Sequence, residues 1–198
     1  RVATCTVALQ DVAMVHTLLR MLDQLLTKEL CKAAGADAKN CAKTIETWFV
    51  FAAVWAFGST LTLKDGEDYR KKFSQYWKDT FKNIKFPHRG EVYDVFVDKA
   101  KKDFVSWSEV VPELEYDSSV TKMTSVTVPT METVAISFWL DNLLPNKHGA
   151  MLIGAAGCGK TFIALHLVLM RLNDGAGDAR VLFVSRNSPL GLFFAKWL

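Results

Sequence analysis

The stretch "MLIGAAGCGKTF", residues 151–162, decides the fold of this 198-residue chain. A short apolar run leads into a glycine-rich loop, and the loop leads into Lys160, Thr161 and an apolar segment with helical spacing. The loop matches the phosphate-binding pattern G-x-x-x-x-G-K-[ST] in full, and a predicted strand at 150–153 and a predicted helix at 160–172 flank it as the motif requires. The stretch therefore predicts the start of an α/β domain with a parallel sheet.

Each part of this loop has a chemical role. Glycines let the backbone fold tightly around an anion, so that successive N–H groups point inward, and the following helix adds its positive N-terminal end. We expect Lys160 to reach the β- and γ-phosphates of ATP or ADP, and the Thr161 hydroxyl to ligate Mg²⁺. The candidate nucleotide-binding residues are Gly154, Ala155, Ala156, Gly157, Cys158, Gly159, Lys160, Thr161 and Phe162.

The motif predicts binding but does not specify hydrolysis. A P-loop ATPase also needs an acidic residue on a neighbouring strand to organise Mg²⁺ and water. The one strand predicted after the loop lies at 181–184, and "VLFVSRN" has no acidic residue where that strand would end. We therefore assign no catalytic residue. The isolated chain, an ATPase by motif, is expected to hydrolyse ATP poorly or not at all.

Composition sets further bounds. Half of the residues are hydrophobic, with 13 Phe and 6 Trp, as in a globular protein. The net charge of +3 is too small to indicate nucleic acid or membrane. The longest apolar run, 48–57, is far short of the roughly 20 residues that span a bilayer, so we expect no membrane contact. No leader sequence is evident, and both ends look cut within structured segments.

The N-terminal part predicts three helices. The first begins at Asp11 as N-cap and runs to about Leu30; the second spans 41–57 with Gly58 as its stop, and its nearly continuous apolar character predicts a central position. A third helix follows "KDGED". The expected apolar face of the first helix is Val12, Val15, Leu19, Leu22 and Leu26, and that of the third is Tyr69, Phe73, Trp77, Phe81 and Ile84.

A β-hairpin is predicted next. The predicted strands are "VYDVFVD" (92–98) and "DFVSWSEV" (103–110), on either side of the basic loop "KAKK", 99–102. Residues 111–129, rich in Ser and Thr with two prolines, form the best candidate linker, and Thr130 caps a predicted helix at 131–144. The predicted fold is thus α/β, with a helical lid and hairpin at 1–115 and the incomplete start of a P-loop, AAA+-like module at 116–198.

Several conspicuous side chains receive the plainer of two interpretations. The basic stretch of the third helix and the hairpin tip could touch a filament or nucleic acid, but solvated faces of ordinary elements also carry such charges. Trp107 and Trp139 are expected in the core rather than on a stacking platform. The four histidines and four cysteines show no metal-ligand spacing, so we assign no metal site beyond Thr161 and expect reduced thiols. The basic residues are Arg70, Lys71, Lys72, Lys78, Lys82, Lys85 and Arg89, with Lys99, Lys101 and Lys102 at the tip.

Four segments in order resemble a dynein heavy chain, and the axonemal type most closely. They are "TWFVFAAVWAFGSTL", "YRKKFSQYWKD", "YDVFVDKAKKDFVSWSEVVPELEYD" and "VPTMETVAISFWLDNLL". The resemblance covers about residues 8–161 and implies the junction between the second and third AAA+ modules of the motor ring. Residues 1–115 would be the second module's lid, and 116–198 would begin the third module, whose nucleotide site is regulatory in the family. The "VPTMETV" segment would lie near the adenine.

The resemblance also implies partners and a location. The partners would be the remainder of the dynein ring and, through the full-length protein, dynein intermediate and light chains and microtubules. The expected location is the cytoplasm and cytoskeleton, in the axoneme of a cilium or flagellum. In such a motor, nucleotide occupancy of this site would bias how the ring transmits strain to microtubule binding.

Two alternatives stay open at this point. Residues from about 152 to 198, with the loop, an "ALH" helix and "VLFVSRNSPL", resemble the start of a superfamily 1 helicase-like domain. The alternative is therefore a nucleic-acid-dependent ATPase fused to a dynein-like segment, through gene fusion or a faulty gene model, and only this alternative implies nucleic acid as a partner. A third hypothesis is a catalytically silent interaction fragment with a structural P-loop.

Overall fold

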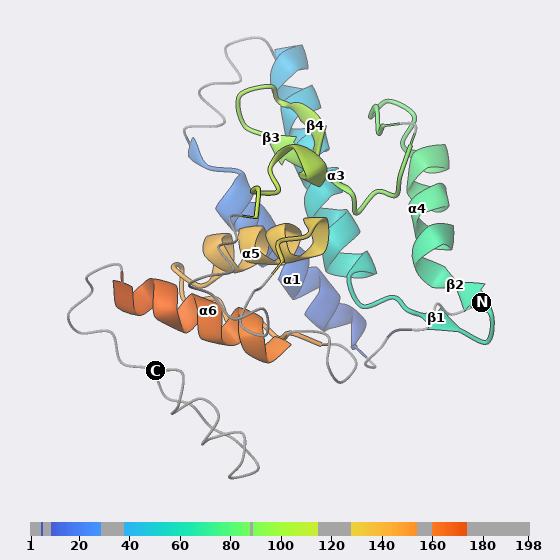
Figure 1. Cartoon of the computed structure of the whole chain (residues 1–198). Coiled ribbons are helices and arrows are strands. Elements are labelled where there is room, and N and C mark those ends of the chain that lie inside the picture. Colours follow the sequence, from blue (N-terminus) through green and yellow to red (C-terminus); the bar gives the residue numbers. More distant parts are fainter. Residues whose placement is uncertain are drawn as a thin grey trace. The chain divides into compact units, whose positions relative to one another are not determined.

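The computed structural model describes residues 5, 9–28, 38–87, 89–114, 128–153 and 160–173. Contacts divide the chain into two compact units, 1–151 and 152–198. The first unit contains the helices α1, α3, α4 and α5 and two small β-hairpins, and the second contains α6 (Figure 1). Within the described residues, no helix is both long enough and apolar enough to cross a membrane.

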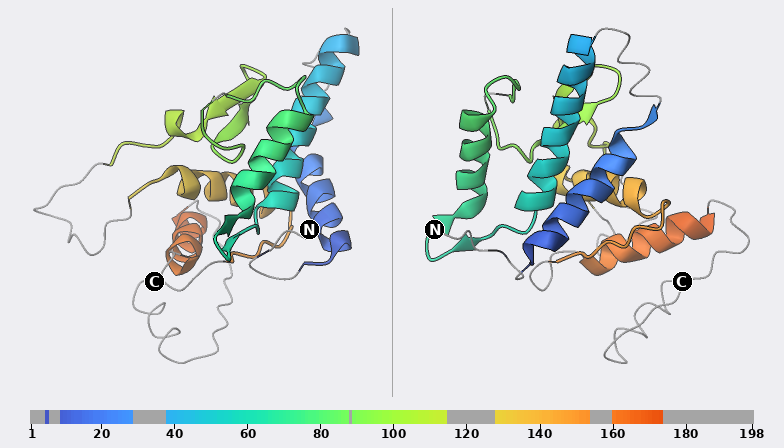
Figure 2. Two further views of the ribbon diagram at one scale, coloured as in Figure 1. Left: turned by 90° about the vertical axis from the view of Figure 1, so that its right-hand side faces the viewer. Right: turned by 180° about the vertical axis from the view of Figure 1, so that it is seen from behind.

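Helix α3 (Ala38–Gly58) is the centre of the first unit. It lies between α1 (Asp11–Leu25) and α4 (Tyr69–Thr80), and it also contacts the second hairpin (Figure 2). Because neighbours cover it on several sides, the helix is apolar almost all round, and residues such as Trp48, Phe51 and Val54 are almost fully buried. The predicted central helix is confirmed, although it begins at Ala38 rather than at Cys41.

Helix α1 turns a different face to the core from the one predicted. Its buried residues are Leu18, Met21 and Leu25, whereas Val12 and Leu19 are 63% and 57% exposed. The helix carries two apolar stripes with the same spacing of three and four, and only packing against α3 selects between them. Of the predicted set, Val12, Val15 and Leu19 are exposed, while Leu22 and Leu26 are half-buried against the core.

Both ends of α1 also differ from the prediction. Gln10 is the N-cap and makes no side-chain capping bond, and Asp11 lies inside the first turn. There its carboxylate still favours the helix, because the N-terminal end carries partial positive charge. The helix ends at Leu25, with Leu26 as C-cap, and so stops short of Leu30.

A tight hairpin connects α3 to α4. Strand β1 (Leu63–Lys64) pairs antiparallel with β2 (Glu67–Asp68) through a turn in which Asp65 and Gly66 have φ of 53° and 78°. Left-handed backbone at both central residues is the geometry that Asp-Gly favours in two-residue hairpins. The Asp68 side chain then caps α4 by accepting from the backbone N–H groups of Arg70 and Lys71.

The predicted aromatic face of α4 is confirmed. Trp77 is buried and stacks on Phe81 with ring centroids 4.5 Å apart. The helix ends at Thr80, so Phe81 is its C-cap, and Ile84 is buried from the segment that follows.

The second hairpin has the predicted basic turn. Strands β3 (Val95–Asp98) and β4 (Asp103–Ser106) pair antiparallel around 99–102, and a 3-10 turn, η1 (Trp107–Glu109), follows. The Asp98 carboxylate accepts from the backbone N–H groups of Ala100 (2.8 Å) and Lys101 (2.7 Å) and so fixes the turn. The strands are shorter than predicted because 92–94 and 107–110 turn away from the ladder.

Helix α5 (Met131–Leu143) closes the core of the first unit. Thr130 caps it in a capping box with Thr133, as the sequence predicts for Thr130. Its Trp139 stacks on Phe51 with centroids 5.0 Å apart, and its Phe138 meets the edge of Trp107 at 5.4 Å. Trp107 and Trp139 are thus core residues, as expected.

The predicted strand at 150–153 does not form in the described structure. Residues 149–153 have no strand pairing, and Met151 is 79% exposed. A strand needs a hydrogen-bonding neighbour, and no described strand lies beside this segment. Its predicted partner at 181–184 lies outside the described residues, as do most of the linker and the turn after α6, so the predicted parallel sheet stays a prediction.

Candidate nucleotide site

Helix α6 (Lys160–Asn173) contains the Lys-Thr pair of the motif. Lys160 is its first residue and Thr161 its second, and both are half-buried. Phe162 follows in the same turn. The other predicted site residues, Gly154, Ala155, Ala156, Gly157, Cys158 and Gly159, lie outside the described residues.

The first turn of α6 carries no acidic residue. By contrast, α1 and α5 have Asp11 and Glu132 in their first turns, and α4 is capped by Asp68. A helix N-terminus has unsatisfied N–H groups and about half a unit of positive charge, which a carboxylate or another anion neutralises. Among these helices, α6 therefore has a first turn that suits an anion from outside the chain, with the cationic Lys160 and a hydroxyl already in place.

Helix α3 is the useful comparison, because its first turn also lacks an acid. No glycine-rich phosphate motif precedes Ala38 in the sequence, and α3 has no Lys-Thr pair at its start. The acid-free turn alone is thus not specific for phosphate. Its combination with the motif, a lysine and a hydroxyl is what fits a nucleotide with Mg²⁺.

The segment that the dynein resemblance associates with the adenine leads into α5. Val128 is 58% exposed and Met131 is also exposed, next to the Thr130 capping box. Exposed apolar side chains beside a fixed helix start are suitable for contact with a flat aromatic base. The structure describes this segment within the first unit, so its approach to α6 stays a prediction.

The described residues offer few ligands for a metal ion. Among the described residues, no group of three His, Cys, Asp or Glu side chains could hold an ion. Within the described part of the second unit, α6 contributes no carboxylate at all. If the site binds a nucleotide, the described residues would supply charge from Lys160 to the phosphates and an oxygen ligand from Thr161 to Mg²⁺.

The basic residues of α4 have specific intramolecular contacts that sequence alone did not give. Lys72 pairs with Glu67 at 2.8 Å, and the Lys72 ammonium lowers the pKa of that carboxyl by hydrogen bonding and by its charge. The Arg70 guanidinium lies 4.4 Å from the centre of the Tyr93 ring. Burial raises the pKa of the Tyr93 phenol well above its usual range, and the hydroxyl donates to the Gly58 carbonyl at 3.0 Å.

Comparison with known protein families decides the identity. Residues 3–109 match the model of the dynein heavy chain AAA lid domain, and residues 115–189 match that of the P-loop containing dynein motor region. This chain belongs to the dynein heavy chains. Its two matched regions account for a lid made of helices and hairpins and for an incomplete α/β AAA+ module.

Individual dynein heavy chains give the same result. The ciliary dynein beta chain of Tripneustes gratilla is 39% identical over 158 residues, which is 79% of this chain. The beta chain of the flagellar outer arm of Chlamydomonas reinhardtii is 37% identical over 160 residues, and human dynein axonemal heavy chain 9 is 35% identical over 158. The chain spans about 3% of the length of these relatives.

The comparisons do not support the helicase alternative. The dynein motor-region match continues to residue 189, across most of the segment on which that alternative rested. The likeness of "VLFVSRNSPL" to a helicase strand therefore has no support from the comparisons. A short apolar strand followed by a polar turn recurs among P-loop folds and does not discriminate between them.

Proposed function

We propose that this chain is the junction between the second and third AAA+ modules of an axonemal dynein motor ring. The lid would occupy 1–115 and the start of the third module 116–198. Its P-loop would bind ATP or ADP with Mg²⁺ through residues 154–162, with Lys160 on the phosphates and Thr161 on the metal. This dynein segment would act in the cytoskeleton of a cilium or flagellum, within a ring that drives microtubule-based motility.

The observation that carries the nucleotide proposal is the start of α6. The helix is described from Lys160, directly after the glycine-rich loop, and its first turn contains no acid. A bound phosphate would supply the negative charge that Asp or Glu provides at other helix starts. Hydrolysis is not part of the proposal, because "VLFVSRN" has no acidic residue where its predicted strand would end.

The regulatory role is supported by where α5 packs. This helix precedes the P-loop in sequence, yet its Phe138 and Trp139 lie against Phe51 of α3. A displacement of the third module on nucleotide binding would pull on a helix that is packed into the preceding module's lid. Occupancy of the site would thereby alter strain in the ring. Through the rest of the motor, with its intermediate and light chains, this strain would alter how tightly the motor binds microtubules.

Titration of the 198-residue chain with a fluorescent N-methylanthraniloyl ATP in the presence of Mg²⁺ tests the site. We expect saturable binding that Lys160→Ala weakens about tenfold or more, the effect of losing hydrogen bonds from a charged donor to phosphate. Thr161→Ala should remove the dependence on Mg²⁺. Lys43→Ala, an exposed lysine on α3, is the matched control and should leave the affinity unchanged.

Absence of saturable binding would overturn the proposal in favour of a structural loop. Equal affinities for Lys160→Ala and the parent would do the same for the role of this lysine. Phosphate release by the purified chain is the second readout. Appreciable turnover that Lys160→Ala abolishes would contradict the expectation that the isolated chain binds without hydrolysing.

A further inference from the structure

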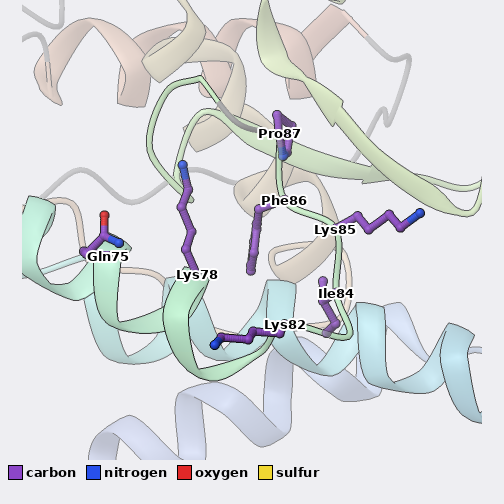
Figure 3. A pocket seen from close by; sticks show the side chains of 7 residues that line it. All are labelled: Gln75, Lys78, Lys82, Ile84, Lys85, Phe86 and Pro87. Atoms are coloured by element: carbon purple, nitrogen blue, oxygen red, sulfur yellow. The ribbon is translucent and has the colours of Figure 1, made fainter.

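A pocket of about 600 Å³ lies beside the end of α4, within the first unit (Figure 3). It combines cationic and apolar side chains, and no carboxylate lines it. Its volume is in the range of sites that hold small molecules or a few side chains of a partner. The lining residues are Gln75, Lys78, Lys82, Ile84, Lys85, Phe86 and Pro87.

The floor of this lysine pocket is fixed by packing. Ile84 is buried in the core cluster, and Phe86 stacks on Phe104 of β4 with ring centroids 4.8 Å apart. Lys78 is held at the edge, since its Nζ donates to the Gly90 carbonyl at 2.6 Å. An apolar floor with one anchored amine therefore exists before any ligand arrives.

Two of the three amines have no acidic partner within the described residues. Lys71 and Lys72, near the start of α4, pair with Asp68 and Glu67. Lys82 and Lys85 are exposed and form no such ion pair there. The carboxylate nearest to the pocket along α4 is Asp79, and it accepts from the Gln75 amide at 2.9 Å. The charge at Lys82 and Lys85 is thus left for a ligand.

The directions of the lysine side chains indicate the kind of ligand. Figure 3 shows the amines of Lys78, Lys82 and Lys85 pointing apart, with Phe86 between them. Donors that bind a single phosphate converge on one point, whereas these are placed to meet negative charges distributed along a chain. Carboxylates on an extended peptide, with a rise of about 3.3 Å per residue, have such a distribution.

We propose that the lysine pocket binds an extended acidic peptide segment of a partner protein. Glutamate or aspartate side chains pair with Lys82 and Lys85, and one apolar side chain covers Phe86 and Pro87. The proposal is independent of the nucleotide site, because the pocket lies wholly within the lid.

The test uses the 198-residue chain and a fluorescein-labelled heptapeptide of glutamates around a central phenylalanine. The comparison peptide replaces every glutamate by glutamine. By fluorescence anisotropy we expect the glutamate peptide alone to bind, and Lys82→Gln with Lys85→Gln to weaken it about fivefold, the combined effect of two exposed ion pairs. Raising the salt concentration should weaken it further. Lys43→Gln with Lys64→Gln removes the same charge elsewhere and should have no effect.

Three results would overturn the proposal. Equal binding of the glutamine peptide would show that the charge is not recognised, and an equal loss in the control pair would show that only net charge matters. Stronger binding of pyrophosphate or of single-stranded RNA, with the same dependence on Lys82 and Lys85, would reassign the pocket to another anion. Far-ultraviolet circular dichroism of both double variants checks that the fold is retained.

Discussion

Replacing Gly58 by alanine tests how α3 ends. An added Cβ would collide with the Tyr93 hydroxyl and lie 2.5 Å from Cε1 of Phe73, closer than side-chain carbons ever approach. Tyr93 is buried, and its hydroxyl donates to the Gly58 carbonyl at 3.0 Å. The single methyl group therefore forces apart an aromatic pair, Phe73 and Tyr93, whose stacked rings have centroids 6.2 Å apart.

The magnitude follows from two losses and one small gain. Overpacking a buried site costs about 1–3 kcal/mol, and a strained or broken hydrogen bond costs about 1 kcal/mol more. Alanine at a helix end recovers a fraction of its roughly 0.5–1 kcal/mol advantage over glycine. We expect Gly58→Ala to lower the free energy of unfolding by about 2–4 kcal/mol, and the melting temperature by roughly 4–16 °C.

Urea denaturation followed by tryptophan fluorescence measures this effect, and Tyr93→Phe supplies the internal check. Removing the hydroxyl costs about 1 kcal/mol by itself but also removes the worst contact for the new methyl group. The double variant should therefore be more stable than the sum of the two single changes predicts, by about 1 kcal/mol or more. If Gly58→Ala is as stable as the parent, or if the two changes are additive, the steric argument is wrong.

Two further changes test other parts of the lid. Trp139→Ala should lower the free energy of unfolding, measured by urea denaturation, by about 3–5 kcal/mol, because it removes the ring that stacks on Phe51. Val12→Ala, on the exposed stripe of α1, should change the same free energy by less than about 0.5 kcal/mol. Similar losses for both variants would contradict the observed face of α1. Backbone N–H groups of Lys101 and Ala100 lower the pKa of Asp98 below its ordinary value of 3.8, so its contribution to stability is present above about pH 4 and is lost as the pH falls through the lowered value. In Asp98→Asn, the urea concentration at the unfolding midpoint should fall less steeply as the pH is lowered from about 4 to 2 than it does in the parent chain. An equal slope in both chains would refute this role of Asp98.

The case of Gly58 shows what sequence could and could not give. A glycine after a long apolar helix correctly predicted the end of α3, but the usual reason, a left-handed C-terminal backbone, does not apply. Positive φ occurs at Gly66 and Gly90 among the described glycines, and Gly58 is required by the space that Tyr93 occupies. That contact joins residues 35 positions apart in sequence, so no local pattern contains it.

The same distinction explains the other outcomes. The Thr130 cap, the "KAKK" turn and the aromatic face of α4 were predictable, because each depends on residues within one turn or one hairpin. The Asp65–Gly66 hairpin has an equally local signal, the Asp-Gly pair in "KDGED", although the patterns described above predict only a helix after that stretch. The buried face of α1 was not predictable, because Val12 and Leu18 lie on two apolar stripes with the same spacing, and packing against α3 decides which stripe is buried.

The candidate site divides in the same way. The helix at 160–172 was predictable from the motif and its register, and α6 confirms it. The predicted strand at 150–153 depends on a neighbouring strand that supplies hydrogen bonds. The sequence of four residues cannot specify that neighbour, because it comes from another part of the chain. The lysine pocket was not predictable either. Its lysines belong to a basic stretch that is visible in the sequence. Only the fold shows that Lys71 and Lys72 have acidic partners, whereas Lys82 and Lys85 have none within the described residues.

The position of α5 links the two halves of this dynein segment. The family match assigns residues 131–143 to the motor region that begins at 115, whereas packing places them in the compact unit that ends at 151. Its aromatic residues interlock with Phe51 and Trp107, and the turn after it is held by the His148 backbone N–H, which donates to the Leu143 carbonyl at 3.1 Å. Aromatic packing of this kind resists small displacements. Gly149, by contrast, has open space where a side chain would be. If a phosphate binds at the start of α6, the segment after His148 is the covalent connection from α6 back to α5, and we expect its length and stiffness to affect how strongly the lid responds.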